Sequence, residues 1–273
     1  MQRSVLVYSR SLDSPDDELT SQPALSQPAA DHIIKLLDSF SQNEYTCLVF
    51  DFYPLGSLHD EARRAKLTEE ERDQVLLQGL AAVDYLHEFG FTHRDIKPEN
   101  MLVRQRRAGR PLHLVLSDFG ACTCQPNMRE LHGSRLYMAP EVIRAQTDPS
   151  VWYDQRVDVW SLAVVVLKHG AGGLPADMAL EAIEKPAIED WARRGIADHC
   201  HRVLLVHARQ HRHAGWRNRA VADLMLVHNP ADRASARVAL LTCRGAMAWP
   251  DNEVKQNQQQ LALMPPLPTP PPQ

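Results

Sequence analysis

The chain has 273 residues, 44% of them hydrophobic and 23% charged, which is enough to bury a core in one large domain or two modest lobes. Its formal net charge of −4 provides no global basic field for holding nucleic acid or an anionic membrane, so we expect neither as a partner. The longest apolar run, at residues 159–167, is about half the roughly 20 residues that a membrane span needs.

The N-terminus and the cysteines indicate the compartment. The first residues include a short apolar patch but lack the longer apolar core and the cleavage site of a secretory signal. The five cysteines are odd in number and irregular in spacing, so they do not suit a disulfide framework. We therefore expect reduced thiols and a cytoplasmic or nuclear location.

The first third of the chain predicts a small amount of β-structure. Residues 11–31 are rich in Ser, Pro, Gln and Asp without a sustained period, which is typical of a loop or a poorly ordered segment. Two apolar runs follow, at 32–40 and 46–53, with β-branched and aromatic residues and a polar stretch between them. This pattern predicts a β-hairpin.

A long helix and a second hairpin come next. The helix begins with a capping box, Thr68 with Glu71 three residues later, and ends on Gly90. The runs at 101–105 and 112–118 predict two paired strands. From about residue 140 to residue 241 the apolar periods are helical, so the architecture is a little β-structure followed by a mostly helical body.

The C-terminal residues 256–273, "QNQQQLALMPPLPTPPPQ", are of low complexity and favour an extended polyproline II tail. Pro265 to Pro268 could dock on an SH3 or WW domain, although no Lys or Arg lies nearby to orient them. A solvated tail is the interpretation we favour, with the SH3 or WW partner as the alternative.

Three polar residues in the middle of the chain suit phosphoryl transfer from ATP. Asp95 could accept or orient the attacking hydroxyl, while the oxygens of Asn100 and Asp118 are hard ligands of the kind that Mg²⁺ prefers. Lys97 would place a fixed positive charge against the transferring phosphoryl group. A lone Asp-Phe-Gly is a weak signal, but the ordered set is a strong one.

From about residue 31 to residue 241 the chain resembles the eukaryotic-type protein kinases. The matching motifs, in family order, are "HRDIKPEN" (93–100), "DFG" (118–120), "YMAPE" (137–141), "DVWSL" (158–162) and "NPADRASA" (229–236). The resemblance implies an α+β, two-lobed fold with a reduced N-terminal β lobe and a mainly helical C-lobe. It also implies transfer of the ATP γ-phosphate to a Ser or Thr of a protein substrate, with Mg²⁺.

By the same resemblance the predicted catalytic residues are Asp95 as base and Lys97 as the phosphate-steering lysine, with Asn100 and Asp118 as metal ligands. A lysine at position 97 is similar to serine/threonine kinases rather than tyrosine kinases.

The nucleotide contacts are implied in the same way. Phe50 matches the gatekeeper, Asp51 to Tyr53 the hinge that meets adenine, and Leu102 the floor of the adenine pocket. Ser57 lies where some kinases place an acidic residue for the ribose and for a substrate arginine, which weakens any expectation of basic-residue specificity, although Glu99 is kept.

Other matched residues are expected to build the fold or to order a loop. The resemblance implies that Glu141 pairs with Arg233 and that Asp158 accepts hydrogen bonds from the catalytic-loop backbone. In the family, the arginine that Arg94 matches usually binds a phosphate on the activation loop. In this chain no hydroxyl residue stands at the position where that phosphate normally forms. We hypothesise that Glu130 supplies a permanent negative charge instead.

The front of the chain departs from the family pattern. The first glycine is Gly56 and the first lysine is Lys35, whereas kinases carry a Gly-rich loop and a strand lysine over the phosphates. If residues 4–8 are what remains of the lysine-bearing strand, Leu6 occupies the lysine position. Two interpretations stay open: an incomplete copy of an active kinase, and a pseudokinase that acts as a protein-binding scaffold.

The expected organisation is an N-terminal remnant or poorly ordered segment (1–30), the remaining N-lobe strands and hinge (31–53), the C-lobe (54–241) and a Pro/Gln-rich tail (242–273).

Three further features have competing interpretations. The His-rich stretch 199–213 is predicted to be an exposed helix and loop rather than a zinc site, because its interleaved arginines repel a cation. Residues 104–110 are predicted to be a solvated, arginine-rich loop, with a docking patch for an acidic partner or a nuclear-import signal as alternatives. Cys122 and Cys124 are either oxidation-sensitive or merely small residues.

Overall fold

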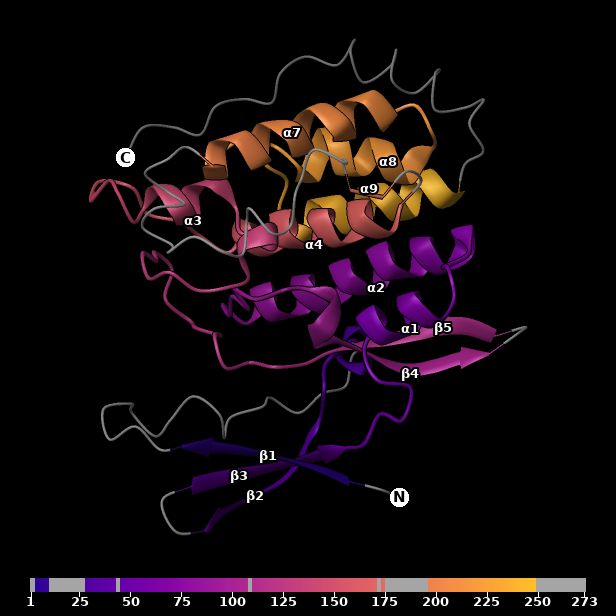
Figure 1. The fold of residues 1–273 in the computed structure, drawn as a ribbon, viewed down its shortest axis with the longest axis vertical. Coiled ribbons are helices and arrows are strands. Elements are labelled where there is room, and N and C mark those ends of the chain that lie inside the picture. Colours follow the sequence, from indigo (N-terminus) through magenta and orange to yellow (C-terminus); the bar gives the residue numbers. More distant parts are fainter. Residues whose placement is uncertain are drawn as a thin grey trace, which may run out of the picture.

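The computed structural model describes residues 3–9, 28–42, 45–107, 110–170, 173–174 and 196–248. A small antiparallel sheet forms one end of the molecule and a larger helical body the other, with a two-stranded ribbon between them (Figure 1). The predicted α+β fold, with a reduced β lobe and a mainly helical lobe, is therefore confirmed.

The small sheet contains β1 (Arg3–Ser9), β2 (Leu36–Gln42) and β3 (Tyr45–Asp51) in the order β1-β3-β2, all antiparallel. The predicted hairpin is β2 and β3. The stretch predicted to be a remnant strand is β1, and its Leu6 lies opposite Leu48 of β3.

The first strand of the hairpin begins later than predicted, because residues 32–35 do not join it. Pro28–His32 form a 3-10 turn, η1, and the two isoleucines after it are buried. The backbone N–H of Ile34 donates to the carbonyl of Leu116, 2.9 Å away in the ribbon between the lobes. These apolar residues therefore join the small lobe to the ribbon and do not extend the hairpin.

The ribbon consists of β4 (Met101–Arg107) and β5 (Arg110–Leu116), which pair antiparallel. The second hairpin is thus confirmed. The prediction of a loop at 104–110 is wrong for its described residues, which lie in strands, and of its arginines only Arg106 is not exposed. Arg104, Arg106 and Arg107 lie in β4, and Arg110 begins β5. The strands are longer than predicted because Arg106 is held by carboxylates and carbonyls of the helical body, which fixes the end of the ribbon.

The long predicted helix is α2 (Glu69–Glu88), and the shorter α1 (Leu58–Arg64) precedes it. Thr68 caps α2 through the predicted capping box with Glu71, which satisfies backbone N–H groups that the first turn leaves unpaired. At Gly79 a Cβ atom would lie 2.5 Å from the side chain of Leu162, so this glycine permits the close approach of α2 to α4 (Arg156–His169).

The helical body is completed by α3 (Pro140–Arg144), α7 (Ile196–His211), α8 (Trp216–Ala220), a π-helical turn (Val221–Met225) and α9 (Ala236–Ala248). The central helix α4 is buried almost throughout, with Trp160 fully enclosed. Burial on all sides explains why its sequence reads as a continuous apolar run. The last helix, α9, continues past the boundary that we expected at residue 241.

The His-rich segment is a helix, as predicted, but it is not exposed throughout. Cys200 and His201 are buried, and His207 hydrogen-bonds through Nε2 to the carbonyl of Gly173. The prediction of an exposed helix is therefore wrong for its inner face, which packs on the helical body. Among the described residues no three His, Cys, Asp or Glu side chains gather as metal ligands.

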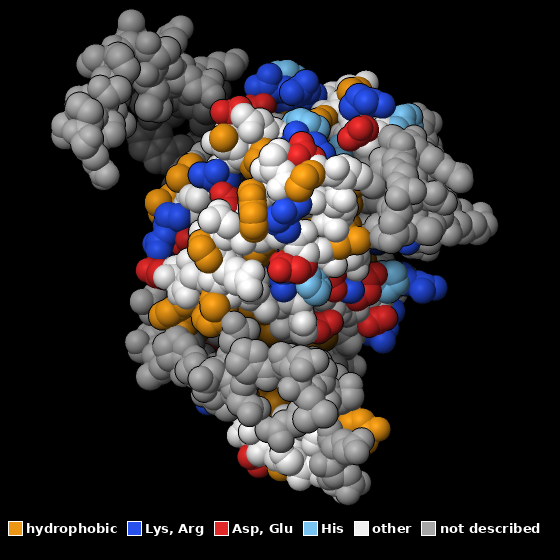
Figure 2. Space-filling model, turned by 90° about the vertical axis from the view of Figure 1, so that its left-hand side faces the viewer, with side chains coloured by type: hydrophobic (Ala, Val, Ile, Leu, Met, Phe, Trp, Pro, Cys, Tyr) orange, Lys and Arg blue, Asp and Glu red, His pale blue; other side chains and the backbone are white. Residues whose placement is uncertain are grey.

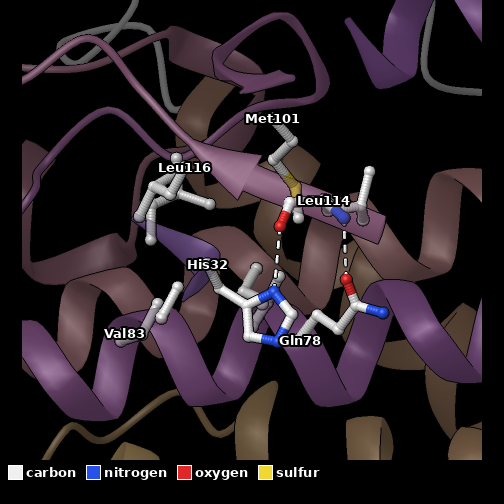
Figure 3. A pocket seen from close by; sticks show the side chains of 10 residues that line it. His32, Gln78, Val83, Met101, Leu114 and Leu116 are labelled. Atoms are coloured by element: carbon white, nitrogen blue, oxygen red, sulfur yellow. Dashed lines mark hydrogen bonds between the residues drawn. The ribbon is translucent and has the colours of Figure 1, made fainter. Parts of the chain in front are cut away.

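A polar cluster joins the small lobe, α2 and the ribbon (Figure 3). His32 Nδ1 donates to the carbonyl of Leu114, and the Leu114 N–H donates to Oε1 of Gln78, at 2.9 and 2.7 Å. The cavity beside them, about 10 Å³, has room for a single water at most. The bond to Gln78 therefore fixes β5, the strand that leads to Asp118, to α2, and the bond from His32 fixes it to η1.

Residues 10–27 and the tail from residue 249 lie outside the described part of the chain, so the predictions for them stay predictions. No helix in the described ranges is long and apolar enough to cross a membrane.

Candidate active site

The catalytic-loop candidate, residues 92–100, connects α2 to β4 and is fixed by the buried carboxylate of Asp158 in α4. Asp158 accepts hydrogen bonds from the backbone N–H groups of His93 and Arg94, each at 2.8 Å, and from His87 Nε2 at 3.0 Å. Burial alone would raise the pKa of Asp158, but the bond and charge of His87, with the contacts of His93, lower it overall. The predicted role of Asp158 as an anchor of the loop backbone is confirmed.

This anchor also holds an unusual backbone conformation. Arg94 has a φ of 67°, in the left-handed region that residues with a Cβ rarely adopt. Such a conformation costs on the order of 1 kcal/mol or more and persists only where the surroundings impose it. The bond from the Arg94 N–H to Asp158 supplies that constraint, so the turn into Asp95 is set by the core helix α4.

Asp95 lies at the centre of a group of hydrogen bonds. Lys97 Nζ is 2.6 Å from Asp95 Oδ2, and the Ser134 hydroxyl donates to Asp95 Oδ1 at 2.9 Å. Lys97 Nζ also donates to Ser134 Oγ at 3.0 Å, which closes a triangle. The two predicted catalytic residues therefore meet, and a hydroxyl from a distant segment fixes both of them.

Asn100 is buried beside the same carboxylate. Its amide nitrogen donates to the carbonyl of Asp95 at 2.8 Å and to Asp95 Oδ2 at 3.3 Å. Both bonds use the nitrogen, so the amide oxygen is the end left available as a ligand.

Asp118 is exposed and lies two residues after the end of β5. Its neighbour Ser117 donates to the Asn100 carbonyl through both its N–H and its hydroxyl, each at 2.9 Å, which ties the end of β5 to Asn100. Asp118 has a φ of 63°, again left-handed, and its Oδ1 accepts a long bond, 3.4 Å, from the Gly120 N–H. One amide oxygen and one exposed carboxylate form an all-oxygen donor set, which is the chemistry that suits Mg²⁺.

Phe50, Tyr53 and Leu102 of the predicted adenine pocket belong to one apolar cluster between the lobes. Its buried members are Ile34, Leu48, Phe50, Tyr53 and Val115, with Leu36, Leu102 and Phe119 packed against them. Phe119 also packs edge-on against the ring of His93, 5.2 Å between centroids. Tyr53, Leu102 and the catalytic loop are thereby brought together, and Asp51 ends the strand β3 that leads to them.

Ser57 is bonded within its own helix. Its side chain is the N-cap of α1: the hydroxyl donates to Asp60 Oδ2 at 2.7 Å and accepts from the Asp60 N–H. These bonds lower the pKa of Asp60, the bond from the Ser57 N–H most of all. Ser57 thus has a structural role here, and its contact with a ribose stays a prediction.

Arg94 and Glu130 meet, as hypothesised. Arg94 Nη1 lies 3.4 Å from Glu130 Oε2, and Arg94 Nε donates to the carbonyl of Ala121. The pKa of Glu130 is lowered, first by a hydrogen bond from its own N–H and further by the charge of Arg94. The Tyr153 hydroxyl donates to the Glu130 carbonyl, so the loop is held at this residue from two sides.

The expected ion pair of Glu141 with Arg233 is also present. It is bidentate, at 2.5 and 3.0 Å, and fully buried, with the guanidinium over the ring of Trp160. It attaches the end of the segment that carries Ser134 to the helical body.

Sequence reasoning missed the roles of Ser134 and His87. For Ser134 a signal was present in the glycine before it. Gly133 has a φ of 108°, and a Cβ there would lie 2.5 Å from the carbonyl of Arg94. Only glycine lets the segment approach the catalytic loop so closely, and that approach brings the next hydroxyl to Asp95.

The segment between β5 and α3 runs along the left side of Figure 1, and Figure 2 shows that face of the molecule. Acidic, basic and hydrophobic side chains are interspersed over its described part, without a broad field of one charge (Figure 2).

Comparison with known proteins gives a consistent result. The family model described as the protein kinase domain matches residues 15–242. The phosphorylase b kinase gamma catalytic chain, liver/testis isoform, of Bos taurus is 32% identical over 233 residues, which is 80% of this chain and 52% of the relative. The Homo sapiens protein of the same description is 31% identical over the same shares.

The serine/threonine-protein kinase CG17528 of Drosophila melanogaster is 35% identical over 153 residues, which is 55% of this chain and 19% of that protein. This chain spans about half the length of the phosphorylase b kinase chains that it matches.

Proposed function

The chain belongs to the protein kinase family, and from that premise we propose that it transfers the γ-phosphate of ATP to a serine or threonine hydroxyl of a protein substrate. The observation that carries this proposal is the group around Asp95. Its carboxylate is bonded to Lys97, Ser134 and Asn100, so that a general base and a cation are fixed within one hydrogen bond of each other.

In this proposal each residue of the group has a separate task. Asp95 accepts the proton of the attacking hydroxyl as the new P–O bond forms. Lys97 remains charged and stabilises the negative charge that develops on the transferring group. Ser134 positions both residues and does not itself touch the reacting atoms.

Asn100 and Asp118 would hold Mg²⁺ through oxygen ligands, and Mg²⁺ would supply charge neutralisation on the phosphates of ATP. The anchoring of Asn100 by its nitrogen, and the exposed carboxylate of Asp118, support this assignment. Adenine would lie against Tyr53 and Leu102, at the apolar cluster that follows the end of β3 at Asp51.

A second function, a scaffold that binds partners without transferring phosphate, is favoured by one observation. β1 carries Leu6 opposite Leu48 at the position expected for the strand lysine. Without a lysine at that position we expect turnover several orders of magnitude below that of a site that has one, since positioning and electrostatics dominate this chemistry.

Nucleotide binding tests the proposed site separately from turnover. We expect ATP to bind the full chain more tightly with Mg²⁺ than without it, and Asp118→Asn to remove that difference, as measured by calorimetry. Equal ATP binding by the wild type with and without Mg²⁺ would show that Asn100 and Asp118 do not hold the metal.

A further inference from the structure

A groove of about 500 Å³ lies away from the candidate active site, between the helices α1 and α2 and the ribbon. Its lining includes Arg64 and Glu71 from the helical side, and Arg107, Arg110 and Pro111 from the ribbon. This volume is within the range of ligand-binding clefts, roughly 300 to 1,000 Å³.

Arg106 holds one wall of the groove rigidly, because its N–H groups donate hydrogen bonds to other residues of the chain. Its guanidinium bonds both carboxylate oxygens of Glu71, at 2.7 and 3.0 Å, and the side chain and carbonyl of Glu61. It also donates to the carbonyls of Ala65 and Lys66. The hydrogen bonds that Arg106 donates to Glu71 raise the pKa of Arg106 further, so this charge is permanent.

The acids that line the groove are mostly neutralised as well. Glu71 forms an ion pair with Arg106, and Glu61 forms ion pairs with both Arg106 and Arg64, the latter at 2.5 Å. Of the lining acids, only Glu70 has no ion-pair partner among the described residues.

Two arginines of the lining, Arg107 and Arg110, form no ion pair with any described residue. They are directly paired across the turn of the ribbon, and both are exposed. Like charges placed directly opposite each other destabilise a strand pair. A bound anionic group between them would relieve that repulsion and gain two charge-assisted hydrogen bonds.

We propose that this groove docks an acidic segment of a protein partner, with its carboxylates on Arg107 and Arg110. Ala65 and Pro111, both exposed in the lining, would meet apolar side chains of that segment. A nucleic acid fits less well, since the lining has no aromatic side chain on which bases could stack, and the two arginines without an ion pair would meet only two phosphates. The proposal does not depend on phosphate transfer.

The test uses the full chain and a dye-labelled peptide of Asp and Glu interspersed with Leu, followed by fluorescence anisotropy at low salt. We expect Arg107→Ala/Arg110→Ala to weaken binding about tenfold or more, the loss of two charge-assisted contacts. The matched control is Arg63→Ala, an exposed arginine of α1 that does not line the groove, and it should change the Kd less than about twofold. Both variants should keep the melting temperature of the wild type, since the replaced side chains are exposed.

Two results would overturn the proposal. The first is equal loss of peptide binding in the Arg63→Ala and double variants, or no loss in either, because binding would then not depend on the groove. The second is tighter binding of a labelled single-stranded oligonucleotide than of the peptide, abolished by the same double variant, because the groove would then be a nucleic-acid site.

Discussion

The hydroxyl of Ser134 donates a hydrogen bond to the carboxylate of Asp95 across 2.9 Å, although the two residues are 39 positions apart in the chain. The same hydroxyl accepts from Lys97 Nζ at 3.0 Å. One small side chain on the segment before α3 therefore sets the orientation of both proposed catalytic residues.

Ser134→Ala should lower phosphate transfer about tenfold or more, because it removes the bonds that orient Asp95 and Lys97. The loss should appear mainly in kcat, since Ser134 is not among the residues placed at adenine. Ser134→Thr keeps the hydroxyl and should restore most of the rate. Steady-state kinetics of the three proteins would check this, and equal kcat values for wild type and Ser134→Ala would contradict a positioning role.

Glu130→Ala should loosen the segment that Arg94 holds. Because Glu130 is half-exposed and its pair with Arg94 is 3.4 Å long, we expect a modest effect of about two- to fivefold on transfer. Limited proteolysis should cut the variant faster near this residue, while the conservative Glu130→Asp is the control.

The account also predicts that phosphatase treatment leaves the wild-type rate unchanged, since Glu130 takes the place of a phosphate. A rate that falls after that treatment would refute this part of the account.

Stability should fall as the pH drops below about 6.5, because buried histidines are held neutral. Burial lowers the pKa of His201 to about 3 and that of His169 to about 4. The folded state therefore resists protonation that the unfolded chain accepts near pH 6.5, so the stabilisation is present above that pH and is lost on descent toward pH 3.

Each such histidine contributes a slope of roughly 1.4 kcal/mol per pH unit once the pH is well below 6.5. His201→Asn keeps a donor for the Met138 carbonyl. It should remove the contribution of His201 to the slope of the unfolding free energy with pH. Urea unfolding at pH 7, 6 and 5 measures it, and parallel curves for wild type and variant would exclude His201 as a source.

Arg106→Ala should destabilise the fold by about 3 kcal/mol, because it leaves the carboxylates of Glu61 and Glu71 largely buried without their shared cation. Arg107→Ala is the matched control in the same strand and should cost less than about 0.5 kcal/mol, since its side chain is exposed. Chemical denaturation of both variants gives the comparison. Equal unfolding midpoints for the two variants would show that Arg106 contributes no more to stability than a solvated arginine.

Much of the fold could be read from local patterns. The capping box of Thr68 with Glu71 marked the start of α2, and two alternating apolar runs marked β4 and β5. The hydrogen bonds of Asp158 to the catalytic-loop backbone and the pairing of Glu141 with Arg233 followed from the family resemblance, because such residues stand at fixed places in its motifs.

The features that were missed depend on contacts between distant segments. Arg106 looked like one arginine in a polar stretch, and only the folded chain places Glu61 and Glu71 around it. His201 looked exposed among arginines, yet the packing of α7 turns it toward the carbonyl of Met138. The residue type and local spacing do not reveal a partner 40 or more positions away, as Met138 and Glu61 are here.

Phosphate transfer by the full chain, compared with Asp95→Asn, tests the central claim most directly. Asparagine preserves the size of the side chain but cannot accept the substrate proton. With radiolabelled ATP, Mg²⁺ and a generic protein substrate, the account predicts measurable labelling of serine or threonine by the wild type and its loss in Asp95→Asn. No transfer by a folded, ATP-binding wild type, or equal transfer by both proteins, would contradict it.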